Sequence, residues 1–304
     1  MDGQKILVLD NFDAEFFTQV RKYGHVIKAD STNGLDTDLA EVDVLVVRSN
    51  TRVDRELGDR MPKLRLVITA THGEDHIDRE YLKKKRISYY NAPVQTSYVA
   101  QGTIAVILAL YTRLVEGDMS MKKGEWRKKD IVGSSIFGKA LGVIGYGRIG
   151  KEVTRLALCL GMKVLVHDPY VKAKDDSVRF LRLEELLKQS DVVSIHVPLT
   201  RETQNLIGKE EIANMKTGAY LVNVSRGGIV DENALLEALN EKKLRGCALD
   251  VYSEMPPKNE TLRKLIQLNN VIATPHSVAQ TEEAIRDKGN AVLEIIKEFV
   301  SRKG

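Results

Sequence analysis

The sequence is poor in cysteine and tryptophan and has no long apolar run. Its 304 residues include two cysteines, Cys159 and Cys247, which lie in separate expected elements with no partner motif nearby. Neither a disulfide framework nor a metal site is therefore expected, and a reducing cytosol fits the composition. The longest apolar stretch, Ile104 to Leu110, is far too short to cross a bilayer. The chain enters an expected strand at Lys5 without a signal-peptide core, so we expect a cytoplasmic protein.

A strong excess of one charge is also absent. The 46 Lys and Arg residues are balanced by 42 Asp and Glu, which leaves a formal net charge of +4. The one dense basic cluster, Lys83 to Arg86, closes an expected helix, where cations suit the helix dipole. We therefore expect neither a nucleic-acid partner nor a membrane partner. The length favours two domains over one.

Short apolar runs alternate with helix-period segments, and this pattern predicts an α/β fold with parallel sheets. In the first part of the chain the expected strands are Lys5–Leu9, Val42–Val47, Leu64–Thr69 and Ile87–Tyr90, and the expected helices are Asp13–Tyr23 and Asp78–Arg86. These elements predict one small doubly wound unit.

A second α/β series follows a largely apolar expected helix, Ser97–Tyr111, and a basic segment, Lys122–Gly138, which contains the only tryptophan, Trp126. Its expected strands lie near Ala140–Gly145, Lys163–His167, Asp191–Val197, Ala219–Val224, Gly246–Val251 and Val271–Thr274, and a long amphipathic helix, Glu282–Arg302, closes the chain. No repeat of 20–50 residues is visible, so a solenoid is not expected.

The strongest local signal is a G-x-G-x-x-G motif made by Gly145, Gly147 and Gly150. An apolar strand precedes it, an expected helix from Lys151 to Leu160 follows it, and the next strand ends at Asp168. This context is the one that a dinucleotide-binding Rossmann βαβ unit requires. The first glycine permits a tight turn, the second allows close approach of a pyrophosphate, and the third allows the helix to pack on the strand. The alternative is a purely structural turn with a coincidental acid.

Asp168 also distinguishes between the two nicotinamide cofactors. A carboxylate at this strand end accepts hydrogen bonds from the ribose hydroxyls and repels a 2′-phosphate. No basic residue follows it directly, because the next residues are Pro169 and Tyr170. NAD is therefore favoured over NADP, with Arg148 and Ile149 beside the phosphates in the glycine loop.

Three further strand ends carry residues suited to catalysis. Arg226 lies beside two glycines after one expected strand, Asp250 ends the next, and His276 follows the last. An open α/β sheet binds its ligand at the carboxyl ends of its strands, so these side chains are expected near one another.

The chain resembles the D-isomer-specific 2-hydroxyacid dehydrogenases, closest to the phosphoglycerate dehydrogenase branch. The similarity spans nearly the whole length. It includes the glycine motif and the segments Val47–Val53, Gly73–Asp78, Asn91–Pro93, Ser190–Thr200, Asn223–Asp231, Ala248–Tyr252 and Thr274–His276. The resemblance implies a Rossmann NAD-binding domain, residues 95–279, inserted in a flavodoxin-like substrate domain, residues 1–94 plus 280–304. It also implies a homodimer, for which the helix from Ser97 and the segment around Trp126 offer apolar residues.

The roles that the resemblance implies agree with the chemistry of the residues. Arg226 would hold the substrate carboxylate and polarise its carbonyl, because a guanidinium donates paired hydrogen bonds. His276 would transfer the proton, since an unperturbed imidazole titrates near neutral pH. The backbone around Gly73 would cradle the carboxylate. The plainer readings are a surface ion pair for Arg226 and a capped strand end for His276. Further cofactor contacts are expected from Pro198, Val224, Ser225 and Asp250.

The sequence departs from the family pattern where a glutamate normally orients the histidine. That glutamate lies five residues after the aspartate that corresponds to Asp250, a position that Met255 occupies here. A carboxylate would raise the histidine pKa, which a thioether cannot do. Either Glu254 takes over this role or His276 works unpaired. Other departures are Thr71 for the first glycine of the carboxylate loop, Thr96 for an asparagine, Gln101 for a glutamate and Val278 for a small residue.

Two hypotheses follow. The first is a cytoplasmic enzyme that interconverts a D-2-hydroxy acid and a 2-keto acid with NAD, in a cleft between the domains. Arg48 is then a candidate for binding a distal phosphate such as that of 3-phosphoglycerate, or else a loop arginine paired with a surface acid. The second is an NAD(H)-binding protein of the same fold with weak or no activity, favoured by Met255. Because the sequence stops at Gly304, feedback through a carboxy-terminal domain is not expected.

Overall fold

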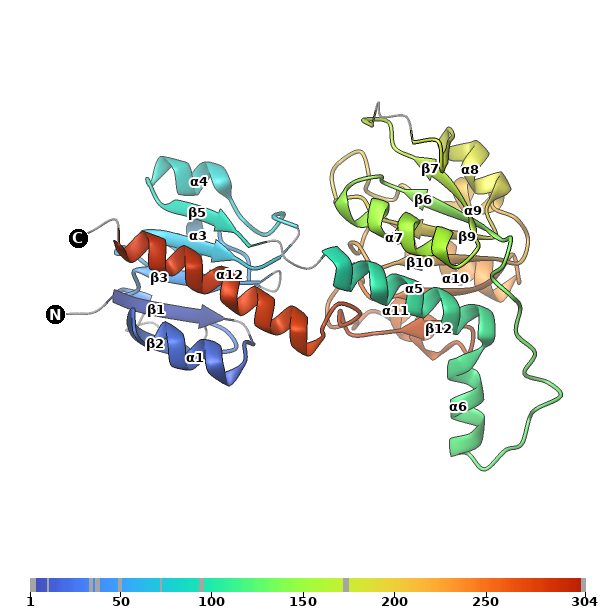
Figure 1. The fold of residues 1–304 in the computed structure, drawn as a ribbon, viewed down its shortest axis with the longest axis horizontal. Coiled ribbons are helices and arrows are strands. Elements are labelled where there is room, and N and C mark those ends of the chain that lie inside the picture. Colours follow the sequence, from blue (N-terminus) through green and yellow to red (C-terminus); the bar gives the residue numbers. More distant parts are fainter. Residues whose placement is uncertain are drawn as a thin grey trace. The chain divides into compact units, whose positions relative to one another are not determined.

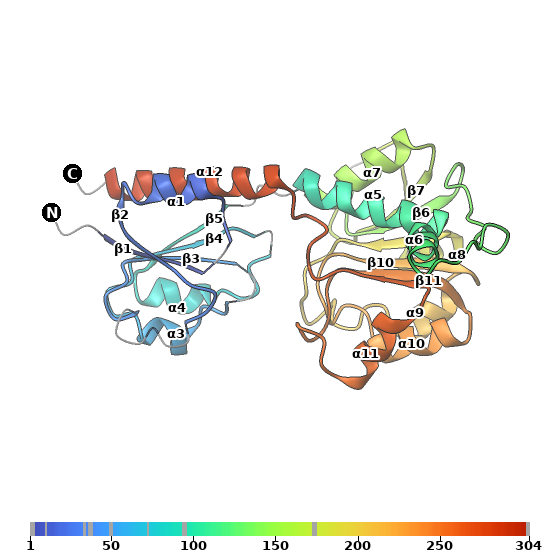
Figure 2. The same ribbon diagram turned by 90° about the horizontal axis from the view of Figure 1, so that it is seen from below.

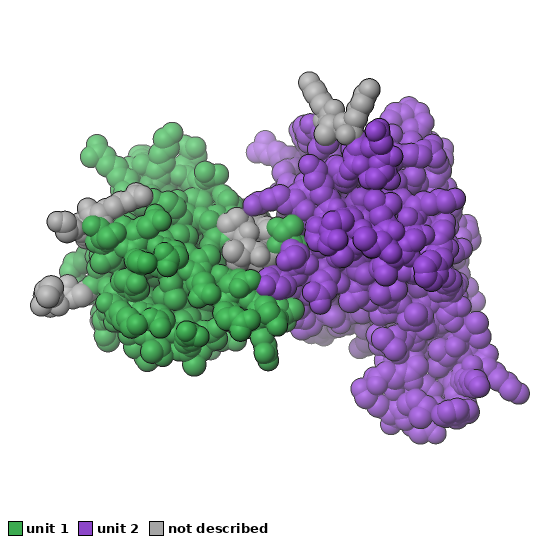
Figure 3. Space-filling view, in the orientation of Figure 1, with its two compact units in different colours: residues 1–96, 280–304 green, residues 97–279 purple. Residues whose placement is uncertain are grey.

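The computed structural model describes residues 4–9, 11–32, 35, 39–48, 51–71, 73–92, 96–171 and 175–301. The chain divides into two compact units, drawn in green and purple in Figure 3. Unit 1 comprises Met1–Thr96 and Gln280–Gly304, and unit 2 comprises Ser97–Ala279. The expected boundaries were 1–94 with 280–304 and 95–279, and the substrate and cofactor roles given to these parts stay predictions.

Unit 1 is built on a five-stranded parallel sheet with the order β2-β1-β3-β4-β5. Its strands are β1 (Gln4–Leu9), β2 (Gly24–Lys28), β3 (Val44–Val47), β4 (Leu66–Thr69) and β5 (Ser88–Asn91), and its helices are α1 (Ala14–Val20), α3 (Arg55–Asp59), α4 (Arg79–Lys84) and α12 (Glu282–Ser301). Every residue of β3 and β4 is buried, as expected for strands covered on both faces. The strand order is the flavodoxin-like one, which confirms this half of the predicted fold.

Helices cover both faces of this sheet. Figure 2 shows α1 and α12 on one face and α3 and α4 on the other. The last helix of the chain therefore completes the first unit, because Val292 and Ile296 of α12 join Phe12 and Phe16 in one buried cluster. Lys288 on the same helix is buried, with its Nζ 4.8 Å from the centre of the Phe12 ring.

Unit 2 contains a seven-stranded parallel sheet with the order β12-β11-β10-β9-β6-β7-β8 (Figure 1). Its strands are β6 (Ala140–Ile144), β7 (Lys163–His167), β8 (Arg179–Phe180), β9 (Val192–Ile195), β10 (Ala219–Asn223), β11 (Leu244–Leu249) and β12 (Val271–Ala273). Its helices are α5 (Thr96–Thr112), α6 (Leu114–Lys122), α7 (Arg148–Cys159), α8 (Leu183–Gln189), α9 (Lys209–Asn214), α10 (Glu232–Asn240) and α11 (Glu260–Gln267). Helices α5 and α7 lie on one face and α9, α10 and α11 on the other (Figure 2). This is the doubly wound Rossmann order, and the second half of the predicted fold is confirmed.

Helix α6 extends away from the sheet of unit 2, and the segment 123–139 returns from its end (Figure 1). Together they form what we call the arm, residues 114–139. The arm exposes Met121, Trp126 and Phe137 to 56, 77 and 75%. No single helix in the described ranges is long and apolar enough to cross a membrane. The pair α5 and α6 passes that test only together, across a bend of 66°.

Two edge strands and one helix start differ from the expectation. Strand β2 has only half-buried and exposed residues and β8 has only two residues, so neither produces an apolar run. Helix α7 begins at Arg148 instead of Lys151, so Arg148 belongs to the helix and not to the loop. The reason is that Gly147 is already the extended N-cap residue, with φ −76° and ψ −162°.

Candidate active site

The carboxyl edge of the seven-stranded sheet gathers the residues predicted for unit 2. Because all pairings in this sheet are parallel, the strand ends meet along one edge. The residues that follow the strands there are Gly145 after β6, Asp168 after β7, Pro198 after β9, Val224, Ser225 and Arg226 after β10, Asp250 after β11 and His276 after β12. Strand order reverses between β6 and β9, next to the glycine motif.

Two glycines of the motif are required by the fold itself. Gly145 has φ +94°, and its N–H donates to the carbonyl of His167 at 2.8 Å. A Cβ on Gly145 would lie 2.6 Å from the carbonyl oxygen of His196. A Cβ on Gly150 would lie 2.0 Å from the carbonyl oxygen of Gly145. Any side chain at either position would therefore push the helix or the neighbouring strand away from β6.

Gly147 is different, because the protein does not need a glycine there. Its φ of −76° suits any residue, and a Cβ built on it meets nothing within 4 Å. It is also the N-cap of α7, and no side chain caps the first turn, which contains Arg148 and Ile149. Open space beside uncapped N–H groups at a helix N-terminus fits the pyrophosphate of a dinucleotide.

Asp168 is fixed by two backbone donors, one within the glycine loop and one in the segment after β7. Its Oδ2 accepts from the N–H of Tyr146 at 2.7 Å and its Oδ1 accepts from the N–H of Tyr170 at 2.9 Å. An ionised carboxylate offers about four lone-pair directions, so two hydrogen bonds leave room for ribose hydroxyls. The arrangement fits the NAD selectivity expected from the sequence.

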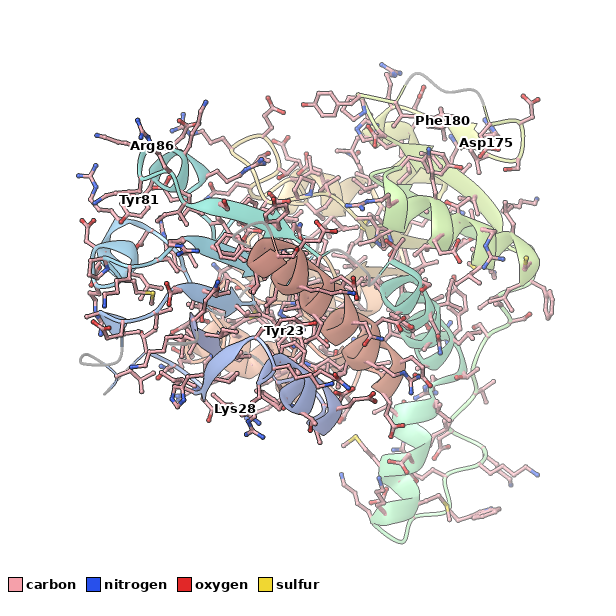
Figure 4. The ribbon with its side chains drawn as sticks, turned by 60° about the vertical axis from the view of Figure 1, so that its left-hand side comes forward. Tyr23, Lys28, Tyr81, Arg86, Asp175 and Phe180 are labelled. Carbon is pink, nitrogen blue, oxygen red and sulfur yellow. The ribbon has the colours of Figure 1, made fainter. Side chains whose placement is uncertain are left out.

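Tyr146 links the glycine loop to the segment after β7. Its hydroxyl donates to Asp175 Oδ2 at 2.5 Å, and its ring packs edge-on against Phe180 at 5.4 Å. Figure 4 labels Asp175 and Phe180 at the same end of unit 2. Burial and the hydrogen bond to Asp175 raise the pKa of Tyr146 to about 12, so the phenol stays protonated at neutral pH.

The loop after β10 is shaped by one buried amide. Asn223 is 2% exposed, and its Nδ2 donates to the carbonyl of Arg226 at 2.8 Å. Its Oδ1 accepts from the N–H and the hydroxyl of Ser225. The guanidinium of Arg226 donates from Nη1 to the carbonyl of Ser225 at 2.8 Å. The loop conformation, and with it the start of the Arg226 side chain, is therefore determined by Asn223.

Asp250 holds the loop that carries His276. Its carboxylate is 2% exposed, and Oδ1 accepts from the Thr274 hydroxyl at 2.6 Å and the Ser277 N–H at 2.8 Å. The Val278 N–H is 3.3 Å from the same oxygen. Burial raises the pKa of Asp250, and these hydrogen bonds oppose that shift. Because the donors lie on both sides of His276, one carboxylate fixes both ends of the loop.

His276 itself has a backbone conformation that is uncommon for residues other than glycine. Its φ is +55°, and its N–H donates to the carbonyl of Thr274 at 3.0 Å. The Tyr252 hydroxyl donates to the same carbonyl at 2.9 Å. Strained conformations of this kind persist where the surroundings determine them, and they concentrate at functional sites.

Glu254 and Met255 lie in the segment before α11. They are the two residues considered for the position of the glutamate that orients the histidine. Glu254 Oε2 accepts from the backbone N–H of Asn259, the N-cap of α11, at 3.2 Å. The Met255 side chain is 45% exposed. A catalytic role for Glu254 stays a prediction.

The residues predicted to bind substrate lie at the carboxyl edge of the other sheet. Arg48 follows β3, and Gly73 lies in the loop after β4. Ser49, Asn50, His72 and Pro93, which belong to the same sequence motifs, lie outside the described residues. Within the described ranges, no three His, Cys, Asp or Glu side chains are grouped so that they could hold a metal ion.

His196 gives unit 2 a specific sensitivity to acid. Its Nε2 is 2.8 Å from the Ser194 hydroxyl, and burial lowers its pKa from 6.5 to about 4. The unfolded chain therefore binds a proton between these values while the folded chain does not. Above pH 6.5 the imidazole is neutral in both states and does not lower the free energy of unfolding. As the pH falls to 4, this free energy should decrease by about 3 kcal/mol. Urea unfolding of His196→Gln should show a weaker loss of stability between pH 7 and 4.5, whereas the exposed-site control His25→Gln should behave like the wild type.

The comparisons with known proteins identify the family of the chain. The family model "D-isomer specific 2-hydroxyacid dehydrogenase, NAD binding domain" matches residues 104–278, more than half of the chain. The chain belongs to this family. It is thus a member of a family of NAD-dependent 2-hydroxyacid dehydrogenases and reductases, as the sequence motifs predicted, and the predicted NAD cofactor is confirmed at the level of the family.

The relatives that this chain matches are named for different substrates. The chain is 41% identical over 303 residues to D-3-phosphoglycerate dehydrogenase of Methanocaldococcus jannaschii, covering 97% of this chain but 57% of that protein. It is 42% identical over 263 residues to hydroxypyruvate reductase of Thermotoga maritima, covering 86% of each. Among solved structures, D-lactate dehydrogenase from Aquifex aeolicus, complexed with NAD and lactic acid, superposes with a TM-score of 0.88 at 32% identity over 98% of this chain and 96% of that one. The chain spans little more than half the length of the phosphoglycerate dehydrogenases that it matches.

Two structural features of the site were not predicted from the sequence. Asn223 was quoted only as part of a motif, and its control of the Arg226 loop depends on its burial. Asp250 was expected to contact the cofactor, which stays a prediction, and its hydrogen bonds to the His276 loop were not foreseen. The signal available in the sequence was a polar residue directly after an apolar strand, in each case inside a longer motif.

Proposed function

We propose that this chain reduces a short 2-keto acid to the D-2-hydroxy acid with NADH, and catalyses the reverse oxidation with NAD. The observation that supports this best is the carboxylate of Asp250, which holds the His276 loop at the edge where Arg226 also lies. A fixed histidine and a fixed arginine at the carboxyl edge of a Rossmann sheet match the needs of a 2-keto acid.

The roles of this chain's residues follow from their chemistry. Arg226 binds the carboxylate and polarises the carbonyl with its planar donors. His276 gives a proton to the carbonyl oxygen during reduction and takes it back during oxidation. Gly147 and the first turn of α7 hold the dinucleotide phosphates, and Asp168 holds its ribose. Bound NADH supplies the hydride.

The test is oxidation of NADH, followed at 340 nm, with hydroxypyruvate, phosphohydroxypyruvate, glyoxylate and pyruvate. We expect turnover of at least one of these acids. NADH binding without turnover of any of them would contradict the proposal and favour the second hypothesis.

The second hypothesis, an NAD(H)-binding protein with weak or no activity, has one specific observation in its favour. Met255 stands where the family resemblance places the orienting glutamate, and Glu254 accepts a hydrogen bond from the backbone of Asn259. A carboxylate at that position would keep a larger fraction of a catalytic histidine protonated near neutral pH, and a thioether does not.

Restoring the glutamate distinguishes these readings. In Met255→Glu, we expect kcat to rise and the pH profile to move upward, because a carboxylate stabilises the imidazolium. The comparison variant is Glu254→Ala. Loss of activity in Glu254→Ala together with no gain in Met255→Glu would assign the orienting role to Glu254 instead.

The substrate within the class is a separate proposal. Arg48 follows β3 at the edge that carries Gly73, and a guanidinium there suits a distal phosphate. The matches to phosphoglycerate dehydrogenases support a phosphorylated acid, whereas the match to hydroxypyruvate reductase supports an unphosphorylated one. Arg48→Gln should raise the KM for phosphohydroxypyruvate much more than the KM for hydroxypyruvate if phosphate is bound there.

We further propose a cytoplasmic homodimer. The exposed apolar residues of the arm need a cover, which a second copy of the chain would supply. Sedimentation should show a dimer that Trp126→Glu weakens. The cytoplasmic location is supported by Cys159 and Cys247, which are both free thiols.

A further inference from the structure

A chain of buried polar side chains follows β4 in unit 1. Thr69 ends the strand, Thr71 and His76 lie in the loop after it, and the three are 0, 7 and 7% exposed. His76 Nε2 lies 2.9 Å from Thr69 Oγ1, which lies 3.1 Å from Thr71 Oγ1. Thr71 Oγ1 is 2.6 Å from the carbonyl oxygen of Gly73. None of the roles proposed above uses these side chains.

The direction of each hydrogen bond in this chain is determined by its last acceptor. A carbonyl oxygen can only accept, so the Thr71 hydroxyl donates its single proton to the carbonyl oxygen of Gly73. Thr71 must therefore accept from Thr69, and Thr69 in turn must accept from His76. His76 consequently carries a proton on Nε2. The result is a relay in which each group donates toward the carbonyl of Gly73.

The relay fixes the peptide that joins Gly73 to Glu74. In a planar trans peptide, the C=O and the N–H point in opposite directions. Because the carbonyl points to the buried Thr71, the N–H of Glu74 points away from it. Within the described residues, that N–H donates no hydrogen bond.

The side chain of Glu74 does not turn back onto its own N–H. Its Oε1 accepts from Asn91 Nδ2 at 2.8 Å, and its Oε2 lies 3.3 Å from Arg79 Nη1. Its carbonyl accepts from the N–H of Ile77 at 3.0 Å. The N–H of Glu74 is therefore a fixed donor beside Gly73, available to an anion.

We propose that His76, Thr69 and Thr71 act as positioning residues that present the N–H of Glu74 to the carboxylate of the substrate. This inference rests on the proposed function and on the carboxylate-binding role that the family resemblance implies for the Gly73 loop. The family resemblance gives a glycine at the position of Thr71, and a glycine has no hydroxyl to donate. The Thr71 hydroxyl thus holds the peptide between Gly73 and Glu74 in place before substrate binds, which lowers the entropy cost of binding.

Removal of one hydroxyl tests the relay in the NADH-loaded enzyme. Thr71→Val keeps the shape of the side chain, and we expect kcat/KM for hydroxypyruvate to fall about tenfold, mostly through KM. Thr71→Ser keeps the hydroxyl and should stay within about twofold of the wild type. The matched control is Thr103→Val, which removes a buried hydroxyl that donates only to the Val99 carbonyl of its own helix. Unchanged kinetics in Thr71→Val, or an equal loss in Thr71→Ser, would overturn the relay.

A second measurement does not depend on turnover. Nitrogen-15 spectra of histidine-labelled protein, assigned with His76→Asn, should show Nε2 of His76 protonated at every pH at which the protein is folded. In the NADH complex, the carboxylate analogue oxamate should shift the amide resonance of Glu74 in the wild type, and the shift should be smaller in Thr71→Val. An unprotonated Nε2, or an amide shift that Thr71→Val leaves unchanged, would overturn the inference. The first of these measurements uses the wild type and therefore does not depend on how well Thr71→Val folds.

These outcomes separate the inference from the proposed function. If the wild type oxidises NADH with none of the keto acids, the proposed function fails, and the protonation of His76 and the oxamate shift still decide the relay. If the wild type is active and Thr71→Val matches it in KM, kcat and oxamate shift, the proposed function stands and the relay fails.

Discussion

Replacing His276 by asparagine should lower kcat by about 10²–10⁴-fold, because an amide cannot transfer a proton near neutral pH. The loop should keep its conformation, since it is held by the carboxylate of Asp250 and the hydroxyl of Tyr252 and not by the imidazole. Asparagine is also among the residues that best tolerate a positive φ, so the φ of +55° adds little strain in the variant. The measurement is steady-state oxidation of NADH with the best keto acid of the panel.

The affinity for NADH separates chemistry from misfolding in this variant. We expect the NADH dissociation constant and the melting temperature of His276→Asn to match those of the wild type. His25→Asn, at an exposed position on β2, is the matched control and should keep full activity. Activity within a few-fold of the wild type in His276→Asn would remove His276 from the proposed chemistry.

Replacing Gly147 by valine should weaken NADH binding more than about 100-fold, which corresponds to about 3 kcal/mol. The structure itself has room for the side chain, because a Cβ at this position meets nothing within 4 Å and φ is −76°. The loss should therefore come from exclusion of the dinucleotide phosphates. Valine is a poorer N-cap than glycine, so the free energy of unfolding should fall by only about 1 kcal/mol.

Two other glycines show whether this loss concerns the ligand or the fold. Gly150→Ala places a Cβ 2.0 Å from the carbonyl oxygen of Gly145, so this variant should lose both NADH binding and a large part of its stability. Gly117→Val on α6, where a Cβ also meets nothing within 4 Å, should lose neither. Wild-type NADH affinity in Gly147→Val, measured by fluorescence titration, would refute the assigned phosphate site.

The sequence predicted the architecture well because apolar runs report burial directly. Strands β3, β4 and β9 are buried at every residue, and each was visible as a short apolar run. Strand β2 was missed because it lies at the edge of its sheet, where only part of each side chain is covered. The start of α7 was placed three residues late, since the conformation of Gly147 does not show in a glycine pattern.

The sequence alone also predicted which residues form the site of unit 2. The glycine motif, Asp168, Arg226 and His276 each follow an expected strand, and parallel strands bring their carboxyl ends to one edge. The sequence by itself therefore determined the fold class, the NAD motif and the identity of the chemically able side chains. These features depend on local patterns and on one rule of sheet topology.

Only the tertiary structure decided how those side chains are held. The hydrogen bonds of Asp250 with Thr274 and Ser277 join residues that are 24 and 27 positions apart in the sequence. The relay from His76 to Gly73 depends on the folded path of one loop. The structure also separated Gly147, where the fold leaves room for a side chain, from Gly145 and Gly150, where the fold requires a glycine. The physical reason is that hydrogen-bond direction and free space are properties of atoms in three dimensions, and residue spacing along a chain does not specify them.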